Sequence, residues 1–331
     1  LSTRPNHLPI EGGALNAGYT MVDALAVVSN FLGNHGLIYR KDWWWEGNGW
    51  TQDMDQALCI EFKEEKNKIL YIVDLEAVDT RYTAEWKKYL PDQLQQALLS
   101  DVVILDVVEV ISGGDVPQAT TPGAFLNFGG TNIYKSNQLQ QIGELFCNGK
   151  INNGDYFLYT DAWNPTVIQL RYMAELLGID IKIGGMWHAG SYDPQDFLGR
   201  IIGSKPWVRY AEASMFECYD HNFFATQFHI DLFCKTFGGS GSDFTEKFVR
   251  TGWPMEYAGS DLLLYKNMEK KDIILFPHRV ASEKQPEIFR DLAESLPEYE
   301  FIICQEQGYT KNEYHNALGE AKLVFSAKLQ E

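Results

Sequence analysis

The chain has 331 residues, 45% of them hydrophobic and 14% aromatic, and its 28 Lys+Arg against 45 Asp+Glu give a formal net charge of −17. This composition is typical of a globular protein long enough for two hydrophobic cores, and it excludes disordered, collagen-like and coiled-coil chains. The sequence has no apolar run of about 18 residues and no basic stripe, so neither a membrane span nor tight binding to duplex DNA is expected.

Residues 1–67 do not join the pattern of the rest and are expected to form an N-terminal extension of unknown role. A helix is expected at Met21–Phe31, followed by the tryptophan-rich segment Lys41–Trp50. These tryptophans either stack on sugar or base rings or build the core of a small module. The chain begins with Leu1, so its true start is expected to lie elsewhere. Five scattered cysteines without a CxxC pair favour reduced thiols and a cytoplasmic location.

From Lys68 onward, short apolar runs alternate with helix-period segments, which is the pattern of parallel β-α-β units. A long loop or inserted hairpin is expected at Ser112–Thr131, and the fourth strand is expected to stop at Gly184. Strands are predicted at Lys68–Asp74, Asp101–Val108, Asp155–Thr160, Ile179–Ile183 and Phe223–Thr226, and helices at Tyr82–Leu99, Leu139–Cys147, Pro165–Leu177 and Gln227–Lys235.

A second series of α/β elements follows a glycine-rich break at Phe237–Gly259. Strands are expected at Asp272–Phe276, Glu300–Cys304 and Ala321–Ser326, and helices at Pro286–Leu296 and Lys311–Leu318. The predicted fold is therefore α/β with two Rossmann-like domains. The boundaries expected are 1–67 for the extension, 68–250 for the first domain and 251–331 for a second domain that is incomplete.

The segment Phe276-Pro-His-Arg279-Val-Ala-Ser-Glu283-Lys284-Gln-Pro286 lies between a predicted strand and a predicted helix. It resembles the motif Gly-Arg-x-x-x-Glu-Lys-Gly of retaining nucleotide-sugar glycosyltransferases of the GT-B fold, the group called family 4, with His278 and Gln285 in place of the two glycines. The resemblance implies that Arg279 and Lys284 hold the diphosphate of the donor and stabilise charge on the departing nucleotide. The alternative is a surface arginine and a charge pair at a helix start.

Three polar residues follow predicted strands of the first domain, where ligands of open α/β sheets bind. By the resemblance, His188 faces the donor sugar and Thr226 contacts the donor diphosphate. From its place at the end of a strand, Asp161 is expected to orient an acceptor hydroxyl or to act as a base. The alternatives are a histidine that caps backbone groups, an aspartate that caps the helix opened by Pro165, and ordinary helix capping by Thr226.

The resemblance extends in order to the end of the chain, where Glu331 falls at the first glutamate of the family's Glu-x7-Glu motif and is expected near the donor sugar or ribose; a solvated terminal carboxylate is the alternative. No metal and no other cofactor is expected, because Arg279 and Lys284 take the place of a metal and Asp53-Met-Asp55 lies outside the α/β units. Where many members have a glycine-rich loop, Asp74–Arg81 has no glycine, so acidic side chains are expected to make the acceptor contacts.

The function that the resemblance implies is metal-independent sugar transfer, with retention, from a nucleoside-diphosphate sugar to an acceptor hydroxyl. The acceptor is open between a saccharide or small molecule and a hydroxymethylated pyrimidine in DNA, since Tyr159–Gly199 is faintly similar to glycosyltransferases encoded by bacteriophages. Two alternatives are a non-catalytic ligand- or partner-binding protein of the same fold and a sugar-nucleotide epimerase.

Overall fold

The computed structural model describes residues 68–78, 81–98, 107–117, 119–121, 126–238, 246–255 and 257–329, together with two short strands nearer the N-terminus. The chain divides into two compact units, Leu1–Asn67 and Lys68–Glu331. In the first unit, β1 (Leu37–Ile38) pairs antiparallel with β2 (Glu61–Phe62). The expected helix at Met21–Phe31 and the tryptophan-rich segment Lys41–Trp50 lie outside the described residues.

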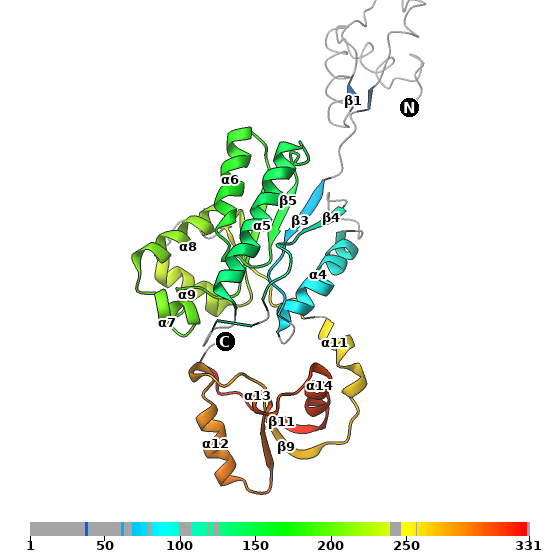
Figure 1. The fold of residues 1–331 in the computed structure, drawn as a ribbon, viewed down its shortest axis with the longest axis vertical. Helices are drawn as coiled ribbons and strands as arrows, with labels where there is room; N and C mark the ends of the chain where they lie inside the picture. The colour runs from blue at the N-terminus through cyan, green and yellow to red at the C-terminus, as the bar shows by residue number, and fades with distance from the viewer. Residues whose placement is uncertain are drawn as a thin grey trace, which may run out of the picture. The chain divides into compact units, whose positions relative to one another are not determined.

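The second unit contains a six-stranded parallel sheet with the strand order β4-β3-β5-β6-β7-β8 (Figure 1). The inner strands β3, β5, β6 and β7 are mostly buried, as expected for a parallel sheet covered on both faces, whereas the edge strands β4 and β8 are partly exposed. The strands are β3 (Ile69–Val73), β4 (Val107–Ile111), β5 (Tyr156–Tyr159), β6 (Lys182–Trp187), β7 (His221–Phe224) and β8 (Phe248–Arg250). β8 lies within the predicted break Phe237–Gly259, so the first sheet continues into it.

Helices cover both faces of this sheet. One core includes Ile142, Leu170, Phe216 and Phe233, which come from α5, α6, α8 and α9, and the core on the other face joins Trp86 of α4 to residues that include Tyr257 of α11. The helices are α4 (Tyr82–Leu98), α5 (Phe128–Cys147), α6 (Thr166–Leu177), α7 (Phe197–Ile202), α8 (Pro206–Cys218), α9 (Gln227–Phe237) and α11 (Tyr257–Asp261).

A three-stranded parallel sheet follows, with the strand order β10-β9-β11. Alternate residues of its central strand enter different cores, Ile273 and Leu275 one of them and Ile274 and Phe276 the other, as the period of two requires. The elements are η2 (Leu263–Tyr265), β9 (Lys271–Phe276), η3 (Ser282–Lys284), α12 (Pro286–Ser295), β10 (Glu300–Ile303), α13 (Cys304–Gln307), α14 (Lys311–Glu320) and β11 (Ala321–Val324). The predicted α/β class with parallel sheets is confirmed.

Two predicted boundaries around β4 and α5 are wrong. β4 ends at Ile111 rather than Val108, because β-branched residues resume at Val110 after the single charged residue Glu109. α5 begins at Phe128, well before the predicted Leu139, where the Asn127 side chain accepts a hydrogen bond of 2.9 Å from the Gly130 amide. Its first turns carry glycines and polar residues, which hide the helical period.

β6 runs through Gly184 and Gly185 instead of stopping before them. A Cβ on Gly184 would lie 2.5 Å from the Tyr156 hydroxyl oxygen, and one on Gly185 would lie 2.6 Å from the Tyr219 ring. These glycines are therefore strand residues that make room for aromatic side chains, and the prediction that they end the strand is wrong.

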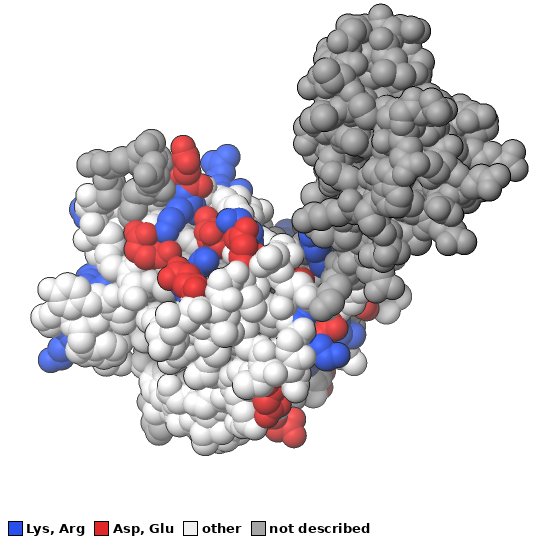
Figure 2. All heavy atoms as spheres, turned by 90° about the horizontal axis from the view of Figure 1, so that it is seen from above, with Lys and Arg blue, Asp and Glu red and all other residues white. Residues whose placement is uncertain are grey.

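Among the described residues, no helix is both long and apolar enough to cross a membrane, and Cys147, Cys218, Cys234 and Cys304 are all free thiols. Figure 2 shows one face of the molecule, on which acidic and basic side chains are interspersed in a cluster. The described residues on that face show no stripe of a single charge.

Replacing Gly185 with alanine should lower the free energy of unfolding by about 1–3 kcal/mol, because the new methyl group overlaps the buried Tyr219 ring. Gly143 of α5 is the matched control: no described atom lies within 4 Å of its would-be Cβ, so alanine there should stabilise the helix by about 0.5–1 kcal/mol. Urea unfolding followed by circular dichroism measures both. Equal stability of the two variants would contradict the packing assigned to Gly185.

Candidate functional site

The first sheet reverses its strand order at β3, which pairs with β4 on one side and with β5 on the other. The connections after β3 and β5 therefore lead in different directions from neighbouring strand ends, and ligands of open α/β sheets bind outside such a switch point. Asp161, His188 and Thr226 follow β5, β6 and β7, so the predicted site residues share this edge of the sheet.

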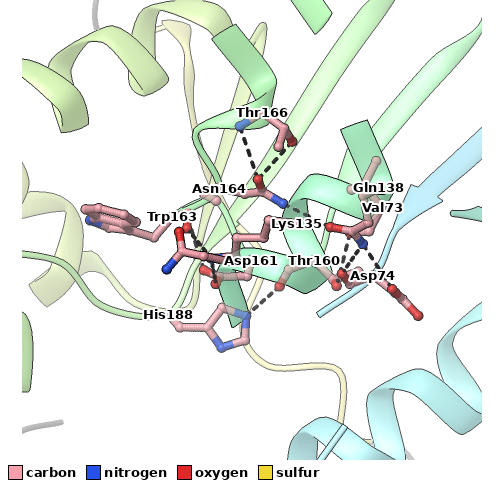
Figure 3. A network of polar contacts seen from close by, with 12 residues as sticks. Val73, Asp74, Lys135, Gln138, Thr160, Asp161, Trp163, Asn164, Thr166 and His188 are labelled. Atoms are coloured by element: carbon pink, nitrogen blue, oxygen red, sulfur yellow. Dashed lines mark hydrogen bonds and ion pairs between the residues drawn. The ribbon is translucent and has the colours of Figure 1, made fainter. Parts of the chain in front are cut away.

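Asp161 lies in a polar network with Lys135 of α5 (Figure 3). Its Oδ2 is 3.5 Å from the Lys135 Nζ, and its Oδ1 accepts a hydrogen bond of 3.0 Å from the Trp163 amide. Lys135 also donates to the Trp163 carbonyl oxygen at 2.7 Å. The alternative that Asp161 caps α6 is wrong, because the Asn164 side chain accepts from the Thr166 amide at 3.2 Å.

His188 is hydrogen-bonded at both ring nitrogens. Its Nε2 lies 2.6 Å from the Thr160 carbonyl oxygen, which only accepts, so Nε2 carries the proton. Its Nδ1 lies 2.6 Å from the Tyr82 hydroxyl and therefore accepts from it. Burial lowers the pKa of His188, against the opposing charge of Asp161. The neutral imidazole thus links α4 to the residue before Asp161, and the alternative that His188 bonds backbone is confirmed.

Three aromatic rings surround the His188 imidazole. The ring centroids of Trp86, Trp253 and Tyr82 lie 4.9, 5.0 and 5.7 Å from that of His188. Trp86 is 3% exposed and Trp253 is 37% exposed, so the cluster reaches from the core to the surface. Helical periodicity marks Trp86 as an apolar position, but nothing in the local sequence relates it to His188.

Thr226 is the N-cap of α9, and its Oγ1 accepts a hydrogen bond of 3.4 Å from the His229 amide. The alternative of ordinary helix capping is therefore confirmed. A capping hydroxyl does not exclude contact with a phosphate at the same helix end, so the diphosphate role of Thr226 stays a prediction.

The second sheet has a switch point of its own, because β9 pairs with β10 on one side and with β11 on the other. His278 follows β9, and its Nε2 lies 2.8 Å from the Ser326 Oγ, which follows β11. Arg279 and Lys284 come from the same connection between β9 and α12. This sheet therefore places the predicted diphosphate-binding residues at the edge where ligands bind in open α/β sheets.

Glu283 holds the connection between β9 and α12. It is 2% exposed, and its carboxylate forms ion pairs with Arg279 and with Arg200, the latter at 3.0 Å. Burial raises the pKa of Glu283, but a backbone hydrogen bond and the two arginines outweigh it and leave the pKa lowered. Burial lowers the pKa of Lys284; Glu283 opposes this shift and Arg279 adds to it. The predicted alternative, an i,i+4 charge pair, is present as Arg279–Glu283.

Gln285 has a φ of 49°, the only positive φ of a non-glycine residue within the described ranges. Glycine adopts this left-handed conformation without cost, whereas other residues pay for it. Gln285 stands where the family motif has its last glycine. The turn before α12 is thus formed by a residue that adopts its conformation at a cost.

Two predicted positions fall outside the described residues: Glu331, and the pair Asp53 and Asp55. Within the part of the chain that the structure describes, no three His, Cys, Asp or Glu side chains are grouped so that they could hold a metal ion.

Gln138, a fully buried residue of α5, belongs to no motif that the sequence reveals. Its Nε2 lies 2.7 Å from the Asp74 carbonyl oxygen and 2.9 Å from the Ile111 carbonyl oxygen, at the ends of β3 and β4. Its Oε1 accepts from Asn164 Nδ2 at 3.3 Å, beyond the end of β5. Gln138 and Lys135 both lie in the part of α5 before Leu139, where no helix is predicted from the sequence.

No family model matches this chain, and no curated protein matches it. One similar solved structure is a UDP-N-acetylglucosamine 2-epimerase, 15% identical, covering 78% of this chain and 74% of that chain with a TM-score of 0.39. Another is UGT2 of Phytolacca americana complexed with UDP-2fluoro-glucose and pterostilbene, 11% identical, covering 79% of this chain and 71% of that chain with a TM-score of 0.37. At these TM-scores, neither likeness assigns a family or a substrate to the chain.

Replacing His188 with glutamine should change how stability depends on pH. Because the folded-state pKa of His188 is lowered, its neutral form contributes stability that is present above the unfolded-state pKa of about 6.5 and is lost as the pH falls through the folded-state value. The melting temperature of the wild type should therefore exceed that of H188Q by more at pH 8 than at pH 5. A difference that is constant or grows toward pH 5 would contradict the neutral, doubly bonded imidazole.

Proposed function

We propose that this protein is a metal-independent glycosyltransferase that uses a nucleoside-diphosphate sugar and acts with retention. The proposal is supported by the side chains at the two switch points, which are basic at one sheet and include a carboxylate and an imidazole at the other. The connection after β9 carries Arg279 and Lys284, whereas the edge beyond β3, β5 and β6 carries Asp161 and His188. Cations suit a diphosphate, and carboxylate and imidazole groups suit hydroxyls.

The donor diphosphate is assigned to Arg279 and Lys284. Glu283 pairs with Arg279, which fixes the guanidinium beside the start of α12, a ten-residue helix whose N-terminal amides also favour an anion. When the bond to the sugar breaks, negative charge develops on the leaving diphosphate. Preorganised positive charges at that point stabilise the transition state more than the ground state.

The acceptor is assigned to the edge of the first sheet. Asp161 orients the acceptor hydroxyl as a hydrogen-bond acceptor, with the Lys135 Nζ 3.5 Å from its Oδ2. His188, which is bonded to Tyr82 and Thr160, borders the donor sugar and holds the backbone of the residue before Asp161 in place. A saccharide or small molecule and a hydroxymethylated pyrimidine in DNA are the two acceptor classes, and contacts of Thr226 and Glu331 with the donor complete the proposal.

Arg279→Ala should weaken the binding of UDP and UDP-sugars about 10- to 100-fold, as expected for the loss of a charge-assisted hydrogen bond. Lys284→Ala should do the same, and both should reduce sugar transfer or hydrolysis of a panel of UDP- and GDP-sugars. Isothermal titration calorimetry with UDP measures the affinity.

Arg290→Ala is the matched control. Arg290 lies on α12, the helix that follows Arg279 and Lys284, and it forms an ion pair with Glu306 at the surface. This variant should leave UDP affinity unchanged. A folded wild type that neither binds nor turns over any nucleotide sugar would refute the proposed function. Binding without turnover would instead indicate the non-catalytic alternative, and release of free sugar with acceptors present would indicate an epimerase-like reaction.

A further inference from the structure

Glu76 lies at the switch point of the first sheet, three residues after the end of β3. The residue is 3% exposed, and its Oε1 has no hydrogen-bond partner among the residues that the structure describes. Burying a carboxylate without partners is costly, so an orphaned oxygen at this depth needs a physical explanation.

The same connection shows how this fold satisfies a buried carboxylate that serves structure. Asp74 is 4% exposed, and its Oδ1 accepts hydrogen bonds from the Tyr134 hydroxyl and from Gln138 Nε2, while its Oδ2 lies 3.2 Å from the Lys87 Nζ. Two residues later, Glu76 has no comparable set of partners. The difference separates a carboxylate that holds the strand end from one that is available to a ligand.

The charges around Glu76 belong to the candidate site. Burial raises the pKa of Glu76; Lys135 and a hydrogen bond from its own backbone oppose the shift, and the charges of Asp161 and Asp74 add to it. Lys135 is already engaged with Asp161 at 3.5 Å and with the Trp163 carbonyl oxygen at 2.7 Å. The charges of Asp161 and Lys135 thus act on Glu76, although Lys135 interacts with Asp161 and the Trp163 carbonyl oxygen and not with the Glu76 carboxylate.

A second buried polar atom lacks a partner at this edge. The Nε1 of Trp86 has none among the described residues, although Trp86 is 3% exposed and its ring centroid lies 4.9 Å from that of His188. The edge therefore offers an unused acceptor in Glu76 and an unused donor in Trp86. A hydroxyl group can serve either of them, because it both donates and accepts.

We propose that Glu76 binds a hydroxyl group of a sugar substrate, as the hydrogen-bond acceptor on the β3 side of the switch point, opposite Asp161 on the β5 side. This inference rests on the proposed function and assigns it a specificity residue. A hydroxyl suits the site because it satisfies the carboxylate without adding charge beside Lys135. The hydroxyl belongs either to the donor sugar or to the acceptor, and the experiment below separates the two.

The first measurement needs no substrate. Replacing Glu76 with glutamine keeps its size and removes the buried charge, so the melting temperature at pH 8 should rise by roughly 2–4 °C. Asp74→Asn is the matched variant: burial also raises the pKa of Asp74, but its carboxylate accepts from Tyr134 and Gln138 and lies beside Lys87, so this variant should gain less than E76Q or lose stability. Since the folded-state pKa of Glu76 is raised, its stabilising effect is full below its unfolded-state pKa and is lost as the pH rises through the folded-state value. The gain of E76Q should therefore grow from pH 4 to pH 8.

The second measurement compares UDP with UDP-glucose by calorimetry on the wild type and on E76Q, together with UDP release from UDP-glucose with water as acceptor. UDP affinity should be unchanged. A donor hydroxyl predicts that E76Q binds UDP-glucose about 10- to 100-fold more weakly. An acceptor hydroxyl predicts unchanged UDP-glucose affinity and UDP release at least about 10-fold slower.

Unchanged affinity and unchanged release in E76Q would overturn the role of Glu76 and leave the proposed function standing. A wild type that binds neither compound would refute the proposed function and, with it, a sugar-binding role of Glu76. A fall in the melting temperature of E76Q at pH 8 would show a structural carboxylate and overturn the inference; a rise that grows with pH would show that the free protein leaves this carboxylate unsatisfied, as the inference requires.

Discussion

The buried amide of Gln138 is the interaction on which the candidate site depends. At a switch point, neighbouring strands lead into connections that diverge, and the backbone groups of these connections need partners from outside the sheet. Gln138 donates to the carbonyl oxygens at the ends of β3 and β4, and it accepts from Asn164 beyond β5 (Figure 3). One side chain thus fixes three connections relative to one another, and the site residues lie on or beside them.

Opposite charges lie close together in the candidate site. Acidic groups gather where β3 and β5 end, and two lysines compensate them, with Lys87 beside Asp74 and Lys135 beside Asp161. At the connection after β9 the arrangement is reversed, because one buried carboxylate, that of Glu283, forms ion pairs with two arginines. A chain with a net charge of −17 therefore places cations at the positions assigned to the diphosphate and keeps carboxylates for the hydroxyl side.

Much of the fold could be predicted from the sequence, because β-branched runs and terminal signals are local. Pro165 and Gly178 mark the two ends of α6, and the alternation of β9, α12, β10, α14 and β11 follows directly from periodicity. The prediction was wrong where tertiary packing decides. Gly184 and Gly185 read as a strand end but make room for aromatic rings, and the polar start of α5 hid its helical character.

The candidate site was only partly predictable for a related reason. Asp161 and His188 follow apolar runs, so the local sequence predicts that they lie beyond strand ends. Lys135 and Gln138 reach the same edge from a helix that carries no motif, and the hydrogen bond from Tyr82 to His188 joins residues 106 positions apart. Such partners become visible only when the strand order is known.

Donor and acceptor are assigned to the switch points of the two parallel sheets. A crystal structure of the protein with a UDP-sugar bound would test this assignment. The diphosphate should lie within hydrogen-bond distance of Arg279 and Lys284, and the sugar should point toward the connections after β3 and β5. A nucleotide sugar bound away from both switch points, with Arg279 still paired only to Glu283, would contradict it.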